Sequence, residues 1–249
     1  MKNILQLKNI SLTYQTMESE IQAIKDLSFN LEEGGFMSII GPSGCGKTSV
    51  LSMIAGLIKP TEGLILIDGE KQGKNTNLGY MLQKDQLFAW RTIEKNIYLP
   101  LEIQGKLTKE NKEYALSLLS KYGLRQFAKN YPDQLSGGMR QRVALIRTLV
   151  SKPKLLLLDE PFSALDYQTR LSVCDDVYSI IKREKKTAIL VTHDISEAIS
   201  MSDIIIVLTS RPAMIKCVFT PNLKQDTPLK RRESNEFGFC FEKIYKELN

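Results

Sequence analysis

Gly41-Pro42-Ser43-Gly44-Cys45-Gly46-Lys47-Thr48 is the stretch that decides the fold of this chain. It matches the pattern G-x-x-x-x-G-K-[ST], in which glycines let the backbone turn with its N–H groups aimed inward at a phosphate. The lysine adds a cation that can reach the β- and γ-phosphates of a nucleotide and serve in catalysis, and the threonine adds a hydroxyl that can ligate Mg²⁺. All eight residues, together with Ser49, are therefore predicted to bind a nucleoside triphosphate.

The segments on either side of this loop support the same interpretation. Phe36-Met37-Ser38-Ile39-Ile40 is typical of a buried strand, and the segment from Ser49 to Leu57 carries apolar residues at helical spacing. The loop is thus expected between a strand and a helix, whose N-terminus adds its own attraction for anions. A glycine-rich turn that matches by chance is the alternative, and the flanking segments argue against it.

The composition is that of an ordinary globular protein. The chain has 249 residues, of which 43% are hydrophobic and 25% charged, enough for one large domain or a core with a subdomain. No apolar run approaches the roughly 18 residues of a membrane span, and the N-terminus lacks an extended apolar signal core. We therefore expect the protein in the cytosol, or at the inner face of a membrane through a partner.

The net charge of +6 and the four cysteines indicate no specialised partner. Lys and Arg are spread along the chain and are dense only at Lys182–Lys186 and Lys230–Arg232, so a generally basic surface is favoured over a nucleic-acid site. None of the cysteines is paired at metal or redox spacing, so they are expected to be reduced thiols.

The N-terminal third of the chain reads as strands and turns. Residues 3–40 are expected to form strands, beginning with an edge strand that contains Leu5 and Ile10. Further strands are predicted at residues 64–67 and 78–82. This part of the chain is expected to form an antiparallel β region before the pattern changes to helices.

The remainder of the sequence predicts an α/β fold. Residues 84–150 have a helical pattern, which includes a helix that starts at Thr92 and ends near Pro100. From residue 154 to 208 strands and helices alternate, which indicates a mostly parallel central sheet interrupted by an inserted α-helical subdomain. The C-terminal expectations are an irregular segment at 210–232 and a helix at 237–248.

Two further segments carry chemistry. Leu155-Leu156-Leu157-Leu158-Asp159-Glu160 places two carboxylates at the end of a buried strand, where ligands of open α/β sheets bind. The first acid can hold Mg²⁺, and the second can orient and polarise an attacking water. Leu135-Ser136-Gly137-Gly138-Met139 opens a helix and could form a second anion site, although a plain helix cap is the simpler interpretation of that segment alone.

These motifs stand in the order seen in the ATP-binding-cassette (ABC) ATPases, which the chain resembles over roughly residues 3–215. Gln83 falls at the Q-loop position of that family, and Tyr14 falls where the family has the aromatic side chain that stacks on adenine. His193 matches the switch histidine. The segments that carry the resemblance are Gly41–Thr48, Leu135–Met139, Leu155–Glu160, Ser163–Asp166 and His193.

Within that family, the chain is most similar to the importer subunits for nitrate, sulfonate, taurine and related small solutes. The segments behind this narrower resemblance are Gln86–Trp90, Asn96-Ile97, Leu135–Arg142 and Arg211-Pro212.

The resemblance implies one P-loop NTPase domain of ABC type over residues 1–249. It divides into a nucleotide-binding core at 1–83 and 151–215, a helical subdomain at 84–150 and a C-terminal extension at 216–249. The cofactors implied are ATP and Mg²⁺, with Thr48, Gln83 and Asp159 as metal ligands.

The resemblance also gives a reason why one chain would have two anion sites. Two copies of the chain would pair head to tail, with each ATP held between one phosphate loop and the Ser136-Gly137-Gly138 segment of the other copy. His193 would contact the γ-phosphate and hold Glu160 and the water, and Asp166 would contact the neighbouring copy. Gln83 would couple the Mg²⁺ site to the helical subdomain.

The partners implied are therefore a second copy, membrane-spanning permease subunits gripped by the helical subdomain and, indirectly, an extracytoplasmic solute-binding protein, with no nucleic acid. The implied location is the cytoplasmic face of the cell membrane, as a peripheral subunit.

The departures from the family pattern remove no catalytic group. They are Met139 at the fifth signature position, Ile146-Arg147-Thr148 for the more usual Ala-Arg-Ala, and Gly35 where an acid often stands. We therefore expect an active ATPase. The alternatives are a non-transport ABC ATPase of DNA repair or translation and a nucleotide-sensing regulator, and the transported solute stays open.

Overall fold

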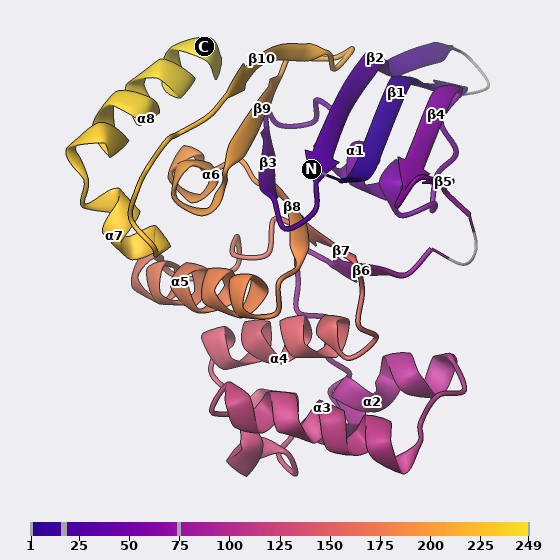
Figure 1. Cartoon of the computed structure of the whole chain (residues 1–249), viewed down its shortest axis with the longest axis vertical. Coiled ribbons are helices and arrows are strands. Elements are labelled where there is room, and N and C mark those ends of the chain that lie inside the picture. Colours follow the sequence, from indigo (N-terminus) through magenta and orange to yellow (C-terminus); the bar gives the residue numbers. More distant parts are fainter. Residues whose placement is uncertain (1, 16–18, 74–75, 249) are drawn as a thin grey trace.

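The computed structural model of this chain describes residues 2–15, 19–73 and 76–248. The chain forms a six-stranded sheet and a four-stranded antiparallel sheet. In Figure 1 the larger sheet runs through the middle of the molecule, the smaller sheet lies on one side of it, and a block of helices lies at the bottom. The expected α/β architecture, with a mostly parallel central sheet, an N-terminal antiparallel region and inserted helices, is confirmed.

The antiparallel sheet has the strand order β2-β1-β4-β5. Strand β1 pairs with β2 on one side and with β4 on the other, so it is an interior strand and the prediction of an edge strand at Leu5 to Ile10 was wrong. Its residues Leu5, Leu7 and Ile10 are buried, as two-sided pairing requires. The strands of this sheet are β1 (Asn3–Gln15), β2 (Glu20–Glu32), β4 (Glu62–Ile67) and β5 (Glu70–Lys71).

The central sheet has the order β10-β9-β3-β8-β7-β6, in which only β10 is antiparallel to its neighbour. Strands β3, β7 and β8 are buried at every residue, which explains why their sequences are apolar except for Ser38, Asp159 and Thr187. Because the other five strands are parallel, their carboxyl ends meet at one edge. The strands are β3 (Phe36–Ile40), β6 (Leu78–Met81), β7 (Leu155–Asp159), β8 (Thr187–Val191), β9 (Ile204–Leu208) and β10 (Ile215–Phe219).

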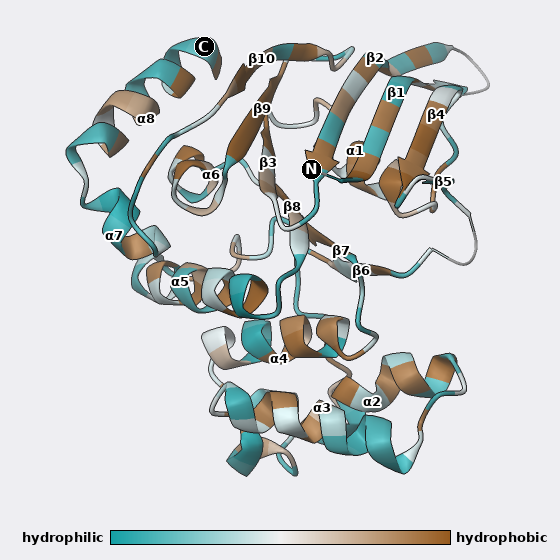
Figure 2. Ribbon diagram, in the orientation of Figure 1, coloured by the Kyte–Doolittle hydropathy of each residue, from teal (hydrophilic) through white to brown (hydrophobic). Residues whose placement is uncertain are grey.

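Helix α1 (Lys47–Ile54) lies between the two sheets. Its buried residues Val50, Leu51, Met53 and Ile54 belong to one apolar core with both the antiparallel sheet and one face of the central sheet. In Figure 2, β4 and β9 are coloured largely toward the hydrophobic end of the scale, whereas β1 and β2 carry both hydrophobic and hydrophilic segments. The residues that follow the phosphate loop are therefore fixed by packing on two sides.

The opposite face of the central sheet is covered by helices. Helix α5 packs there with the inserted helices in one core, and α6 and α8 pack against β3 and β9 in another. The helices are α5 (Tyr167–Arg183), α6 (Ile195–Met201), α7 (Pro228–Arg232) and α8 (Asn235–Leu248).

The inserted block consists of α2 (Ile93–Ile103), α3 (Lys109–Lys121) and α4 (Gly137–Leu149), with 3₁₀ turns at Arg125–Phe127 and Pro132–Gln134. Helix α2 does not end near Pro100, as the sequence suggested, but continues through it. Burial of Leu101 in the core offsets the hydrogen bond that proline cannot donate, so tertiary packing outweighs local propensity.

The segment 210–232 is also more regular than predicted. Strand β10 pairs with β9, and Thr227 caps the short helix α7 through its side chain. The alternation of Ile215, Cys217 and Phe219 with exposed neighbours was the overlooked strand signal.

Among the residues described, no helix has the length and apolar character needed to cross a membrane.

Two glycines with left-handed backbones provide a test of the antiparallel sheet. Gly63 (φ +91°) and Gly69 (φ +82°) both have a backbone conformation that side chains rarely adopt. A Cβ at Gly63 would also lie 2.4 Å from the carbonyl oxygen of Asn9, whereas a Cβ at Gly69 would have no atom within 4 Å. We expect Gly69→Ala to cost about 1 kcal/mol of unfolding free energy and Gly63→Ala about 2 kcal/mol more. Urea unfolding of both variants measures the difference, and equal losses would contradict the close approach of these strands.

Candidate functional site

The phosphate loop joins the carboxyl end of β3 to the first turn of α1. Gly44 (φ +72°) and Gly46 (φ +124°) adopt left-handed backbones that other residues rarely adopt. A side chain at Gly41 would come within 3.1 Å of Cys45 and Leu208, so this glycine is needed for space. The loop therefore has the tight turns from which successive N–H groups can face one anion.

Lys47 is buried, with 6% of its surface exposed, and its ammonium group points back into the loop. Its Nζ donates hydrogen bonds to the carbonyl oxygens of Gly41 (2.8 Å) and Pro42 (2.9 Å). The loop thus holds a cation at its centre, where a phosphate would need one.

Thr48 and Asp159 meet at the carboxyl edge of the sheet. The Thr48 hydroxyl donates to Oδ1 of Asp159 at 3.1 Å, and the Tyr80 hydroxyl donates to Oδ2 at 3.2 Å. Burial raises the pKa of the Asp159 carboxyl, and burial together with the Asp159 charge raises the pKa of Tyr80 to about 12. A buried carboxylate of this kind favours a cation beside it.

Glu160 and His193 form the next pair along this edge. Glu160 follows the last residue of β7, and its N–H donates to the carbonyl oxygen of Val191 at the end of β8. Its Oε2 lies 3.1 Å from Nδ1 of His193, at hydrogen-bond distance. The Glu160 side chain is only 22% exposed, whereas that of His193 is 58% exposed, so the histidine reaches outward from the sheet edge.

Tyr14 lies near the end of strand β1. Its hydroxyl is 3.0 Å from the hydroxyl of Ser49, just beyond the phosphate loop. A hollow of about 520 Å³ opens beside it, and Ile58 and Lys59 contribute to its lining. The aromatic ring therefore lies where it could contact the base of a nucleotide whose phosphates are bound by the loop.

Ser136, Gly137 and Gly138 lie apart from this group, at the start of α4 in the helical block (Figure 1). The Ser136 hydroxyl accepts the N–H of Met139 at 3.3 Å, which is a helix cap. A Cβ at Gly138 would lie 2.7 Å from Val173, so the helix start is held tightly against α5. Within the described parts of the chain, no hydrogen bond or ion pair joins these three residues to the phosphate loop.

Gln83 is exposed, two residues beyond the end of β6. This places it at the same sheet edge as Asp159, because β6 pairs in parallel with β7. Its predicted role as a metal ligand stays a prediction.

Sequence reasoning missed a buried charged cluster behind His193. Glu197 on α6 is 2% exposed and accepts the Thr192 hydroxyl at 2.6 Å. The Arg170 guanidinium lies 3.5 Å from Asp194 and 3.9 Å from Glu197, and it also donates to the carbonyl oxygen of Leu165. Arg170 thus ties the segment after β7 to the start of α6, and only the fold brings these residues together.

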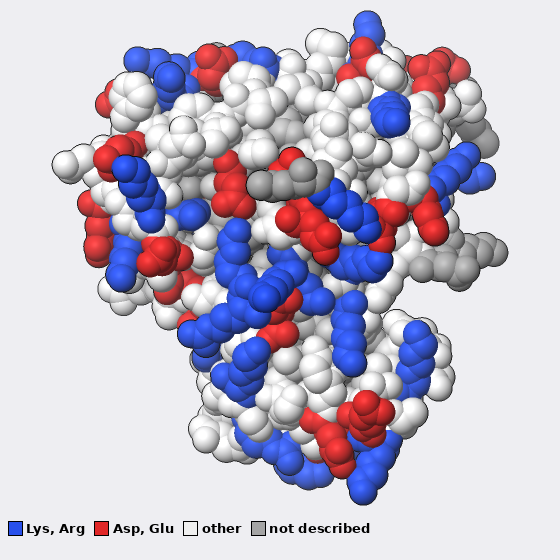
Figure 3. Space-filling model, viewed as in Figure 1, with Lys and Arg blue, Asp and Glu red and all other residues white. Residues whose placement is uncertain are grey.

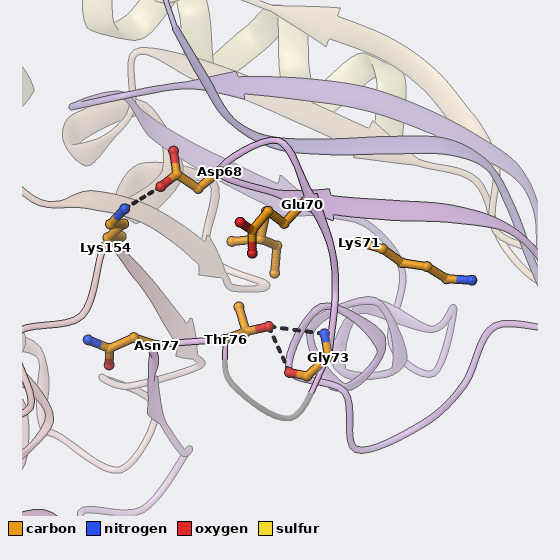
Figure 4. A pocket seen from close by; sticks show the side chains of 8 residues that line it. Asp68, Glu70, Lys71, Gly73, Thr76, Asn77 and Lys154 are labelled. Carbon is orange, nitrogen blue, oxygen red and sulfur yellow. Dashed lines mark hydrogen bonds and ion pairs between the residues drawn. The ribbon is translucent and has the colours of Figure 1, made fainter.

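Other charged and hollow regions lie elsewhere. On the face in Figure 3, Lys and Arg are interleaved with Asp and Glu. The ion pairs of the described residues include Lys121–Glu184 and Lys182–Asp203. The hollow in Figure 4 has a volume of about 350 Å³ and includes Asp68, Thr76 and Lys154. Since Lys154 precedes β7, this hollow lies at the opposite end of that strand from Asp159.

Comparison with known proteins gives consistent results. The family described as "ABC transporter" matches residues 24–163. The chain is 50% identical to the ABC transporter ATP-binding protein YtlC of Bacillus subtilis, over 99% of this chain and 96% of that protein. It is 38% identical to an aliphatic sulfonates import ATP-binding protein of Bacillus cereus (97% and 93% covered) and 37% identical to a nitrate import ATP-binding protein of Synechocystis (91% and 86%).

Among solved structures, the chain is similar to the ATP-binding cassette MJ0796, determined as a dimer in a post-hydrolysis state with ADP and phosphate. The TM-score is 0.73 and the identity 33%, over 87% of this chain and 98% of that one.

The buried Glu197 predicts a pH dependence of stability. Burial raises its pKa from 4.5 to about 7, against the opposing effect of Thr192, with Asp194, Arg170 and Arg232 as the charged groups around it. Between these pH values the folded chain holds a proton that the unfolded chain has lost, so this residue makes stability fall as pH rises, by up to about 3 kcal/mol.

Glu197→Gln replaces the titrating carboxyl group by a neutral amide, whose oxygen can still accept the hydrogen bond from Thr192. We expect the stability of the parent relative to this variant to decrease between pH 5 and pH 8, as measured by urea unfolding. Glu242→Gln, at an exposed position on α8, is the control. If the parent and Glu197→Gln changed in parallel with pH, Glu197 would not be protonated in the folded state.

Proposed function

We propose a transport role for this chain, which belongs to the ABC transporter family. It is an ATP-binding subunit of the importer branch, and it hydrolyses ATP. We propose that it energises the import of a small solute such as nitrate, a sulfonate or taurine. The relatives named for sulfonate and nitrate import support this solute class.

The observation that carries the proposal is the meeting of the phosphate loop, Asp159 and the Glu160–His193 pair at one edge of the sheet. A phosphate loop alone indicates only a nucleotide binder. A carboxylate that can act on water, held by a histidine beside that loop, adds the group that hydrolysis requires.

The residues around Thr48 fit a magnesium ion. A hydroxyl and a carboxylate lie 3.1 Å apart and offer hard oxygen donors, and burial makes the Asp159 charge costly without a cation. We assign Thr48, Asp159 and Gln83 to holding Mg²⁺. When bound, the ion would neutralise charge on the β- and γ-phosphates.

The protein groups then divide the remaining work. Lys47 would exchange the carbonyl oxygens of Gly41 and Pro42 for phosphate oxygens, and the loop N–H groups would bind the same phosphates. Glu160 would orient the water that attacks the γ-phosphorus as the bond to ADP breaks. His193 would hold the Glu160 carboxylate through the contact at 3.1 Å, and Tyr14 would stack on adenine.

The separation of Ser136–Gly138 from the loop supports a site shared between two copies. In this proposal the start of α4 in one copy completes the phosphate site of the other, and the dimeric state of the similar solved cassette supports such pairing. Residues 84–150 would contact membrane-spanning permease subunits, and a solute-binding protein would act through them. The chain would then be a peripheral subunit at the cytoplasmic face of the membrane.

Substitution of Glu160 tests this assignment. We expect Glu160→Gln to bind ATP normally, to lose at least about 100-fold in turnover, and to accumulate as an ATP-bound dimer, because the amide cannot accept a proton from water. Phosphate release and size-exclusion chromatography with Mg²⁺ and ATP measure these effects. Glu70→Gln, an exposed glutamate in β5, should behave like the parent. Parental turnover in Glu160→Gln would refute the assigned role.

A further inference from the structure

The segment between β9 and β10, residues 209–214, is held in place by several hydrogen bonds, and we call it the bracket. The Thr209 hydroxyl donates to the carbonyl oxygen of Pro212 and accepts the N–H of Met214, both at 3.0 Å. The buried Ala213 donates to the carbonyl oxygen of Ala23 (2.9 Å) and accepts the N–H of Lys25 (3.0 Å). These bonds attach the segment to β2, so it spans the central and the antiparallel sheets.

This bracket carries Arg211 to the phosphate loop. The Arg211 Nη2 donates a hydrogen bond of 2.7 Å to the carbonyl oxygen of Gly44, although 167 positions separate the two residues in the sequence. Lys47 holds the carbonyl oxygens of Gly41 and Pro42. Two cations therefore bind carbonyl groups of the same loop, and they approach it from different segments of the chain.

The bond from Arg211 constrains an N–H group of the phosphate loop. In a trans peptide the C=O and N–H point in opposite directions, so a fixed Gly44 carbonyl also fixes the Cys45 N–H. That N–H donates a hydrogen bond of 3.3 Å to the carbonyl oxygen of Pro42, which also accepts from Lys47, so it faces the interior of the loop and would exchange this carbonyl for a phosphate oxygen. A peptide next to a glycine with φ +72° has more freedom to rotate than most, so an external hold on its carbonyl matters here.

We propose that Arg211 is a positioning residue for the phosphate loop, which keeps the Gly44–Cys45 peptide oriented so that its N–H faces the phosphates of the bound nucleotide. The inference rests on the loop being the ATP site. It adds a residue from the far end of the chain to that site, and it gives the bracket at 209–214 a function.

The bond predicts a specific kinetic signature. The Gly44–Cys45 peptide acts on the nucleotide in the ground state and in the transition state alike, so its loss should weaken binding more than chemistry. We expect Arg211→Met to weaken ATP and ADP binding and to raise KM by about 10-fold, with kcat within about 2-fold of the parent, because hydrogen bonds to charged groups contribute at this level. Arg211→Lys keeps a cationic donor and should recover most of the affinity.

The experiment compares the parent with Arg211→Met, Arg211→Lys and Arg183→Met, in which the substituted arginine is exposed at the end of α5. Calorimetric titration with ATP and with ADP, at low salt and at high salt, gives the affinities, and circular dichroism confirms that each variant is folded. The proposal predicts a loss of affinity in Arg211→Met that persists at high salt, partial recovery in Arg211→Lys and no change in Arg183→Met.

Three results would overturn the proposal: parental affinity in Arg211→Met, a loss that disappears at high salt, which would show charge attraction alone, or a fall in kcat without a change in KM. Failure of the underlying site is distinguished by Lys47→Ala. If that variant also kept full affinity for ATP, the phosphate loop itself would not be the nucleotide site.

Discussion

The hydrogen bond between Thr48 and Asp159 depends on the alignment of the whole central sheet. The two residues lie 111 positions apart, on the helix after β3 and at the end of β7, and β8 lies between these strands. The bond forms only if the three parallel strands end at the same edge, as their pairing requires. Burial of these strands on both faces fixes that alignment, so packing of the apolar core also positions the residues of the site.

The same dependence explains which parts of the fold could be predicted from the sequence. Residues 155–158 and 188–191 are apolar without interruption, and the loop at Gly41 connects a strand to a helix, so the parallel sheet was predictable. The signal for strand β10 was weaker and was overlooked, because the strand has only five residues, none fully buried, and Lys216 interrupts the apolar pattern. The passage of α2 through Pro100 depends on tertiary packing of Leu101, which no local signal expresses.

In the candidate site, motifs predicted the residues but not their contacts. Thr48, Asp159, Glu160 and His193 come together as the motif order implied, while Tyr14 reaches the loop from a strand. The contacts of Tyr80 with Asp159, of Arg170 with the start of α6 and of Arg211 with Gly44 join distant segments without a motif. Such long-range contacts are visible only once the sheets are folded.

We propose above that each ATP site is shared between two copies of the chain. The most direct measurement mixes Lys47→Ala, which damages the phosphate loop, with Ser136→Arg, which damages the start of α4, and follows phosphate release. Each variant alone should be inactive. A mixed dimer keeps one site with an intact loop from one copy and an intact Ser136 from the other, so we expect mixing to restore activity. If the mixture stayed as inactive as its components while forming dimers, each site would lie within a single chain.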